Sequence, residues 1–196
     1  MSAEPQAARC AVCGSFLCEE GAVVSPYFLL LGLALTFLPR HDPRSVLAVR
    51  FRWPGLLLGG FAAQALLAVA ASSGWGRNPV LLELAFVPIL LGLWANLKVT
   101  GVGAVLAGAL ANAVALLLYG GLMPVSPAAM RMAGLSANAG AFLASSRHQF
   151  MHPSLFWWLG DWIPLFHFVL SPGDLLVGAG LIWFLYASSA KRGSHE

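Results

Sequence analysis

Apolar residues gather in five long stretches, and polar or Pro- and Gly-rich segments separate them. The stretches cover residues 23–38, 54–73, 79–97, 99–119 and 173–190. Wound as helices, they are apolar on all sides, which is typical of helices surrounded by lipid. A membrane-spanning helix needs roughly 20 apolar residues, and only the first stretch is clearly short, with Pro26 near its start. The pattern predicts an all-α fold, a polytopic membrane helix bundle of about five transmembrane helices.

The segment between the fourth and fifth stretches, residues 120–172, is too polar and too interrupted to span a membrane. It is rich in Trp and Phe, which favour the level of the lipid headgroups. We expect it to be an outer loop that carries one or two short interfacial helices. The chain is then one transmembrane domain over residues 23–190, with a polar N-terminal tail (1–22) and a short C-terminal tail (191–196).

Composition supports the membrane interpretation. Hydrophobic residues make up 59% of the 196 and charged residues 10%, and the mean hydropathy is +0.77. Soluble domains carry about 25% charged residues, so the predicted partner is the lipid bilayer. The formal net charge of +3 is not gathered into a dense basic face, so we expect no nucleic-acid partner.

The few basic residues predict an orientation. Lys and Arg concentrate in cytoplasmic loops of membrane proteins. With five spans, three basic segments fall on one side, and this predicts a multi-pass protein of the cell (plasma) membrane whose C-terminus is cytoplasmic. These residues are Arg40, Arg44, Arg50, Arg52, Lys98, Lys191 and Arg192.

Asp174 has two interpretations. In the first, Ser171 caps the fifth helix, Pro172 takes its first position and the Asp174 carboxylate reaches back to the capping N–H. In the second, Asp174 is a carboxylate held for acid–base chemistry. Asp161 is the other acid of this region, and two carboxylates that approach each other push one pKa upward. The cap is the favoured interpretation.

Three further groups of side chains are weaker candidates. Asn112 and Gln64 lie within predicted helices, where such amides usually bond a neighbouring helix. His148 and His152 are four residues apart and would share a helix face, a spacing that suits a metal pair or simply an aqueous interface. Cysteines in a C-x2-C-x4-C pattern form half of a zinc or redox site, or part of a disordered tail: Cys10, Cys13 and Cys18. No cofactor or metal is predicted.

Two resemblances add to these patterns. The segments Gly120-Gly121-Leu122-Met123-Pro124-Val125-Ser126, Leu159-Gly160-Asp161-Trp162-Ile163-Pro164 and Leu170-Ser171-Pro172-Gly173-Asp174 resemble an uncharacterised bacterial multi-pass membrane family, classified only as a domain of unknown function. That resemblance implies no activity.

A more distant similarity is to lipoprotein signal peptidases, which are membrane aspartyl proteases. Asn112 fits the asparagine of their first motif, Asp161-Trp162-Ile163 resembles their middle motif, and Asp174 stands at one catalytic aspartate. Ala115 occupies the position of the other catalytic aspartate. The similarity implies a shared helix topology and puts proteolysis in doubt.

The sequence thus leaves the question of an enzyme open. The first hypothesis is an integral membrane protein that binds a lipid or a membrane-protein partner at its outer face, with candidate binding residues Asn112, Met123, Pro124, Trp162 and Ser171. The alternative is a membrane hydrolase with Asp174 and Asp161 as its catalytic acid and base. Carboxylates that face one cavity favour the enzyme, and carboxylates that each cap a separate helix exclude it.

Overall fold

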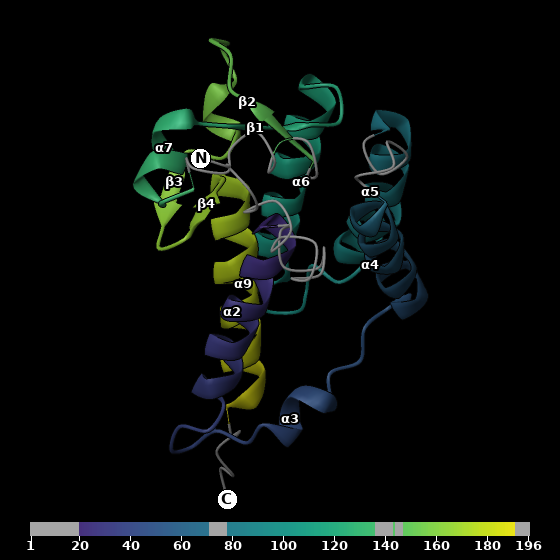
Figure 1. The fold of residues 1–196 in the computed structure, drawn as a ribbon. Coiled ribbons are helices and arrows are strands. Elements are labelled where there is room, and N and C mark those ends of the chain that lie inside the picture. The colour runs from purple at the N-terminus through teal and green to yellow at the C-terminus, as the bar shows by residue number, and fades with distance from the viewer. Residues whose placement is uncertain (1–19, 71–77, 136–142, 144–146, 191–196) are drawn as a thin grey trace, which may run out of the picture.

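Two of the long helices begin at capping residues that the sequence supplies locally. The computed structural model describes residues 20–70, 78–135, 143 and 147–190, and the rest is grey in Figure 1. Helix α5 (Pro79–Trp94) starts after Asn78, whose Oδ1 accepts a hydrogen bond from the backbone N–H of Val80 at 3.0 Å. Helix α9 (Pro172–Ser189) starts after Ser171, and the capping box with Asp174 that the sequence predicts is confirmed.

Five helices lie side by side in a row (Figure 1). Helix α2 packs on α9, α9 on α6, α6 on α5 and α5 on α4, while the short α3 lies at the far end of α9. The other three members of the row, besides α5 and α9, are α2 (Glu20–Leu35), α4 (Pro54–Val69) and α6 (Val102–Leu118), and the separate short helix α3 is Arg44–Leu47. The row places α4 on one edge and α2 on the other.

Helices α6 and α9 approach each other closely because glycines face each other between them. A methyl group added to Gly108 would collide with the backbone oxygen of Gly173 and lie 2.8 Å from the Val177 backbone nitrogen. Helix α6 ends at Leu118, and the two glycines shortly after it, Gly120 and Gly121, both have positive φ (67° and 84°). After α6, the chain forms a small cap that contacts α6 and α9 at the same end of both helices (Figure 1).

The cap contains strands, so the prediction of an all-α fold is wrong. Strand β1 pairs in parallel with β2, and β3 pairs with β4 as an antiparallel hairpin whose turn includes Phe166 at φ 52°. The cap elements are β1 (Met123–Val125), α7 (Pro127–Met132), β2 (His148–Phe150), the 3₁₀ helix η4 (Trp157–Leu159), β3 (Ile163–Leu165) and β4 (Phe168–Leu170). Residues 120–172 therefore do not form an outer loop built of interfacial helices alone.

The prediction of a multi-pass membrane bundle is also wrong. Helices α2, α4 and α5 have 16 residues each, α6 has 17 and α9 has 18. Sixteen residues reach about 24 Å at 1.5 Å per residue, less than the roughly 30 Å of a bilayer core. Among the described residues, no helix combines the length and the apolar character that a crossing requires. The predicted cell-membrane location and the cytoplasmic C-terminus are overturned with it.

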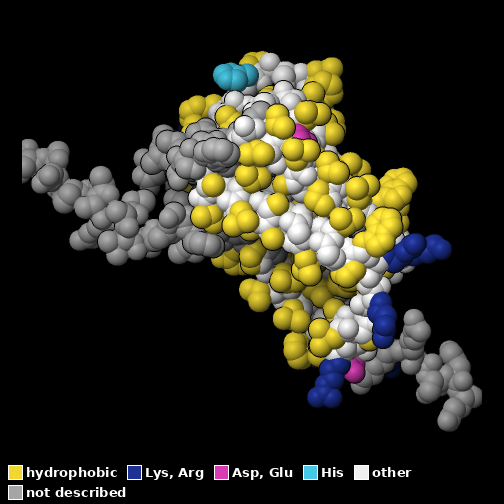
Figure 2. Space-filling view, turned by 90° about the vertical axis from the view of Figure 1, so that its right-hand side faces the viewer, with side chains coloured by type: hydrophobic (Ala, Val, Ile, Leu, Met, Phe, Trp, Pro, Cys, Tyr) yellow, Lys and Arg dark blue, Asp and Glu magenta, His cyan; other side chains and the backbone are white. Residues whose placement is uncertain are grey.

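The helices nevertheless carry many exposed apolar side chains. Figure 2 shows hydrophobic side chains over most of one face of the described molecule, with Lys and Arg toward one end. Leu58 and Leu66 of α4 are each 71% exposed, and Phe166 in the β3–β4 turn is 84% exposed. Apolar residues thus occupy both the outer and the inner sides of the helices, which is why periodicity does not separate the two sides.

Candidate functional site

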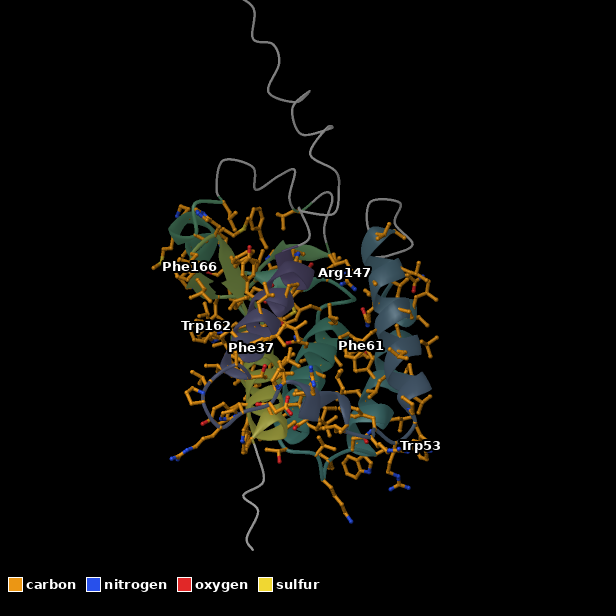
Figure 3. The ribbon with its side chains drawn as sticks, turned by 90° about the horizontal axis from the view of Figure 1, so that it is seen from below. Phe37, Trp53, Phe61, Arg147, Trp162 and Phe166 are labelled. Carbon is orange, nitrogen blue, oxygen red and sulfur yellow. The ribbon has the colours of Figure 1, made fainter. Side chains whose placement is uncertain are left out.

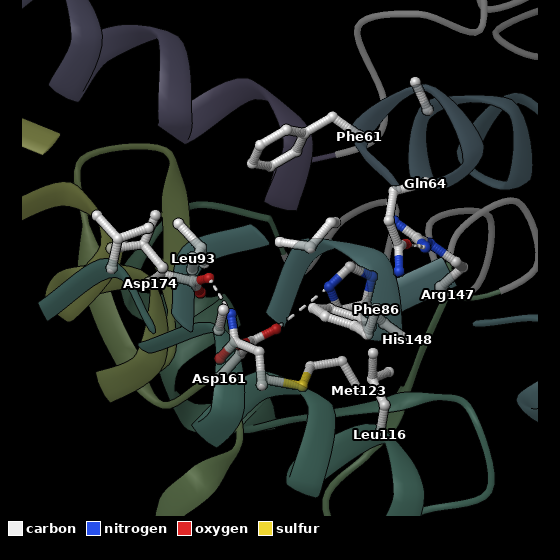
Figure 4. A pocket seen from close by; sticks show the side chains of 16 residues that line it. Phe61, Gln64, Phe86, Leu93, Leu116, Met123, Arg147, His148, Asp161 and Asp174 are labelled. Carbon is white, nitrogen blue, oxygen red and sulfur yellow. Dashed lines mark hydrogen bonds and ion pairs between the residues drawn. The ribbon is translucent and has the colours of Figure 1, made fainter. Parts of the chain in front are cut away.

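A pocket of about 350 Å³ lies where the row of helices meets the cap (Figure 4). Its volume falls within the range of about 300–1,000 Å³ typical of small-molecule sites. The apolar part of the wall comes mostly from α4, α5, α6 and α9, including Phe61, Phe86, Ile89 and Val177, and Met123 of β1 adds to it. Six polar or charged residues complete the lining: Gln64, Asn112, Arg147, His148, Asp161 and Asp174.

Two backbone hydrogen bonds to the β1 segment hold the main chain of Asp161 in place. The Asp161 N–H donates to the Pro124 carbonyl oxygen at 2.8 Å, and the Asp161 carbonyl oxygen accepts from the Ser126 N–H at 2.8 Å. Because both backbone groups of Asp161 are bonded to the β1 segment, its side chain has a defined position at the pocket wall. On the other side of β1, the parallel pairing with β2 sets Met123 opposite His148.

The Asp161 carboxyl group is buried, with only 4% of the residue exposed. Its Oδ2 lies 3.2 Å from His148 Nε2, while its Oδ1 has no hydrogen-bond partner among the described residues. Burial raises the pKa of Asp161 from 3.8 to about 6; His148 lowers it in part through its hydrogen bond and charge, and the Asp174 charge raises it further. Asp161 is thus a carboxyl group that changes protonation close to neutral pH.

Asp174 caps the start of α9 and also lines the pocket. Its Oδ1 accepts from Asn112 Nδ2 at 2.8 Å, and its Oδ2 accepts from the Ser171 N–H at 2.9 Å. The Ser171 hydroxyl lies 2.8 Å from Asp174 Oδ2 and 3.0 Å from Asn112 Oδ1, so its single proton serves one or the other. The two interpretations of Asp174 are therefore compatible: it caps α9, and it lines the same pocket as Asp161.

The opposite wall of the pocket carries a positive charge. Arg147 Nη1 donates to Gln64 Oε1 at 3.0 Å, and Gln64 Nε2 donates to the Leu82 carbonyl oxygen of α5 at 3.2 Å. In Figure 4, Arg147 and Gln64 lie on one side, Asp161 and Asp174 lie on the other, and His148 is between them. The prediction that Gln64 and Asn112 bond neighbouring helices is confirmed for both, and each of them also lines the pocket.

The structure separates the predicted site residues into two groups. Asp161, Asp174, Asn112 and Met123 line the pocket, and Ser171 is buried directly behind Asp174 and Asn112. Pro124 is buried in β1 and contributes its carbonyl oxygen to Asp161. Trp162 is not part of the pocket lining; its indole N–H donates to the Trp158 carbonyl oxygen, and Figure 3 shows it near the outer edge, away from Phe61 and Arg147.

The histidine pair does not lie on a helix, so that prediction is wrong. His148 is in strand β2 and faces Asp161, and His152 is exposed just after the strand. Within the described part of the chain, no group of three or more His, Cys, Asp or Glu could hold a metal ion. Cys10, Cys13 and Cys18 lie outside the described residues.

The sequence interpretation missed Arg147 and His148 as partners of the two acids. Arg147 is one of only seven charged residues between Trp53 and Ala190, and it directly precedes His148. A charged residue next to a histidine within an apolar chain is the signal that could have drawn attention to this segment. The apolar wall gave no signal, because its residues have the same types as those of the exposed helix faces.

Comparison with known proteins assigns the chain to a family. No curated protein and no solved structure matches the chain. A family model described as a family of unknown function, DUF5317, matches residues 48–186, from the end of α3 almost to the end of α9. The match includes every residue that lines the pocket. The resemblance to a family of unknown function is thereby confirmed, and this chain is a member of the DUF5317 family.

Proposed function

We propose that this protein binds a small amphiphilic, lipid-like molecule in the pocket. The apolar body of that molecule lies along α4, α5 and α6, and its polar group meets Asp161. The observation that carries the proposal is the buried Asp161 Oδ1, which has no partner among the described residues and stands at the polar end of a largely apolar pocket. Leaving a buried acceptor unpaired costs about 1–3 kcal/mol, and a ligand N–H or O–H would remove that cost.

The shape of the wall supports an elongated occupant. Val105, Ala109, Asn112 and Leu116 of α6 all line the pocket at spacings of four, three and four residues, so they form one stripe on the helix. Eleven residues of helix correspond to about 16 Å of length. The polar groups gather around Asn112 and the cap, while Val105 lies toward the apolar end. A molecule with a polar head and an apolar body matches this gradient.

Binding of N-phenyl-1-naphthylamine tests the proposal, because this probe has an apolar body and one N–H and fluoresces in apolar surroundings. We expect saturable binding that Ala65→Phe weakens at least tenfold, since Ala65 is exposed on α4 at the pocket wall and a larger side chain fills the space. The matched control is Ala62→Phe, exposed on the same helix and outside the lining.

Asp161→Asn should also weaken binding of this probe, by about tenfold, because a charge-assisted hydrogen bond becomes a neutral one. Equal binding by the wild type and both Phe variants would mean that the probe attaches to the exposed apolar surface, and the proposal would fail.

A second candidate function is acid–base hydrolysis at the same pocket. Asp161, whose pKa burial raises to about 6, lines the cavity together with Asp174, and two carboxyl groups in one site can divide the roles of acid and base. A neutral Asp161 would donate a proton to the substrate carbonyl oxygen while the Asp174 carboxylate takes a proton from the attacking water. When the C–N bond of the tetrahedral intermediate breaks, Asp161 recovers its proton from the hydroxyl group and Asp174 gives its proton to the leaving amine. The segments around Asn112, Asp161 and Asp174 resemble motifs of lipoprotein signal peptidases, but Ala115 stands where those enzymes have their other catalytic aspartate. In this arrangement Asp161, and not the residue at position 115, supplies the second acid.

Decanoyl p-nitroanilide, an amide with an apolar chain, tests hydrolysis. We expect a rate that falls as the pH rises through about 6, where Asp161 loses its proton. Asp161→Asn should lower kcat by about 100-fold, and Asp42→Asn, which removes an acid far along the chain from the pocket segments, should not change it. Turnover that is absent, or that Asp161→Asn leaves unchanged, would exclude this second candidate.

A further inference from the structure

One buried oxygen at the polar end of the pocket lacks a hydrogen-bond donor. Asp161 lines the pocket and is 4% exposed, and its Oδ1 has no hydrogen-bond partner among the described residues (Figure 4). The other carboxylate oxygen, Oδ2, lies 3.2 Å from His148 Nε2. An ionised carboxylate accepts hydrogen bonds and donates none, so an N–H or O–H of the occupant is the group that completes this end of the pocket.

The side-chain amides of the pocket donate to other acceptors. Asn112 Nδ2 donates to Asp174 Oδ1 at 2.8 Å, and Gln64 Nε2 donates to the Leu82 carbonyl oxygen at 3.2 Å. Each amide therefore joins two helices, α6 to α9 and α4 to α5, and is held in place by that bond. The free hydrogen-bonding capacity at Asp161 is an acceptor, and it selects an occupant by the donor that the occupant carries.

The charged residues that line the pocket have an excess of negative charge. The carboxylates of Asp161 and Asp174 stand against one guanidinium, that of Arg147, which leaves a net charge of −1 when His148 is neutral. This count includes the full charge of Arg147, which also donates to Gln64 Oε1 at 3.0 Å. Water screens charges less in a site with apolar walls than in bulk solution. A positive head group is therefore the electrostatic complement of this end of the pocket.

The two carboxyl groups act on the same region of the pocket. Burial raises the pKa of Asp161, His148 lowers it in part, and the Asp174 charge raises it further, so the field of Asp174 extends to Asp161. A positive charge placed beside Asp161 therefore interacts favourably with both carboxylates. The same position brings a donor within reach of Asp161 Oδ1.

We infer that the occupant is a single-chain amphiphile with a primary ammonium head group, which donates one N–H to Asp161 Oδ1. This inference rests on the proposed binding of an amphiphile and specifies its head group. An ammonium group has three N–H donors and no acceptor, so it supplies the missing hydrogen bond and the missing positive charge together. A hydroxyl group supplies only the hydrogen bond, and a quaternary ammonium supplies only the charge. The apolar chain extends along α6 toward Val105.

Four decyl compounds separate the donor from the charge. Decylamine carries both at about pH 7.5, where the amine is protonated and Asp161 is ionised. Decanol has the donor without the charge, decyltrimethylammonium has the charge without a donor, and decyl sulfate has a negative charge and no donor. Displacement of the bound fluorescent probe, below the micelle concentration of each compound, measures the four affinities. We expect decylamine to bind at least about tenfold more tightly than each of the others, the ratio that one hydrogen bond to a charged group provides.

Asp161→Asn tests the contact itself. The affinity for decylamine should fall at least about tenfold, to about that for decanol, and the affinity for decyl sulfate should not fall. Asp42→Asn removes a carboxylate outside the pocket lining and should leave all four affinities unchanged. If Asp161→Asn does not fold, the wild-type series still decides, because the four compounds differ only in the head group. Propylamine, which has the head group without the chain, should not displace the probe.

The outcomes separate the head group from amphiphile binding. Decanol that binds as tightly as decylamine would overturn the ammonium head group, and so would decyl sulfate. Equal binding by decyltrimethylammonium and decylamine would overturn the N–H contact with Asp161, as would an unchanged affinity of Asp161→Asn for decylamine. Each of these results leaves amphiphile binding intact. Failure of every decyl compound to displace the probe would overturn the proposed function itself.

Discussion

Asp161→Asn is expected to make the protein more stable at neutral pH, by up to about 3 kcal/mol. The pKa of Asp161 rises from 3.8 in the unfolded chain to about 6 in the folded one. Each pKa unit corresponds to 1.36 kcal/mol, and the shift therefore to about 3 kcal/mol. Below pH 3.8 both states hold the proton. Between 3.8 and about 6 only the folded state holds it, so stability falls as the pH rises.

Above about pH 6 both states have lost the proton, and the stability contribution of Asp161 levels off at its lowest value. Asparagine has no charge to bury and keeps an oxygen that accepts from His148. The stability of the variant should therefore not fall between pH 3.8 and about 6. Urea unfolding of both proteins across the pH range measures the effect as the difference between the two profiles. Burial also raises the pKa of Glu83. Because both proteins contain Glu83, its contribution to the pH dependence of stability cancels in that difference.

The control for this prediction is Asp42→Asn, which removes a carboxylate whose Oδ1 accepts from the Arg44 N–H outside the pocket. It should keep the wild-type fall between about pH 4 and pH 6. Parallel profiles for wild type and Asp161→Asn would show that Asp161 does not carry the pH dependence. A residue that lowers stability and supports binding is typical of a functional site rather than a structural one.

Gly173→Ala is the second substitution with a large expected effect, a loss of about 3 kcal/mol of unfolding free energy. A methyl group on Gly173 would collide with the Asn112 side-chain oxygen and lie 2.9 Å from the Gly108 carbonyl oxygen. Helices α6 and α9 would have to separate at the level of the Asn112–Asp174 hydrogen bond. Denaturant unfolding gives the stability change, and probe binding reports the accompanying loss of the pocket.

The matched control is Gly59→Ala. Gly59 is exposed within α4, and an added methyl group meets nothing within 4 Å, so alanine should stabilise the helix by about 0.5–1 kcal/mol. Asn112→Ala combined with Gly173→Ala removes the amide that the methyl group strikes and should recover part of the loss. A neutral Gly173→Ala would contradict the close approach of the two helices.

A local capping motif correctly predicted the start of α9. The lengths of the apolar runs, in contrast, wrongly predicted helices long enough to cross a membrane. Ser171, Pro172 and Asp174 form the predicted cap because that motif needs only neighbouring residues. The apolar run 79–97 extends past the end of α5 at Trp94. There Asn96 accepts from the Arg52 N–H at 2.7 Å and donates to the Arg52 carbonyl oxygen at 2.9 Å. Such hydrogen bonds end a helix without any change in hydropathy.

The contact between Asp161 and His148 could not be predicted from the residues next to each of them in the sequence. Asp161 reaches His148 because β1 pairs with β2 on one side and bridges to Asp161 on the other. Met123 and His148 are 25 positions apart in the chain, and strands of three residues are too short for period-two alternation to predict. The sequence therefore offered both acids that line the pocket as candidates, but it did not predict the histidine and the arginine that line the pocket with them.

The pocket walls come from segments spread between Phe61 and Val177, in four helices and the cap. No contiguous piece of the chain holds the pocket by itself, so any occupant binds only the folded whole. Binding and folding are then thermodynamically linked. An occupant present at about 100 times its Kd would raise the free energy of unfolding by about 2.7 kcal/mol. This gain nearly equals the cost of burying the Asp161 charge, so the occupied protein recovers the stability that its binding site gives up.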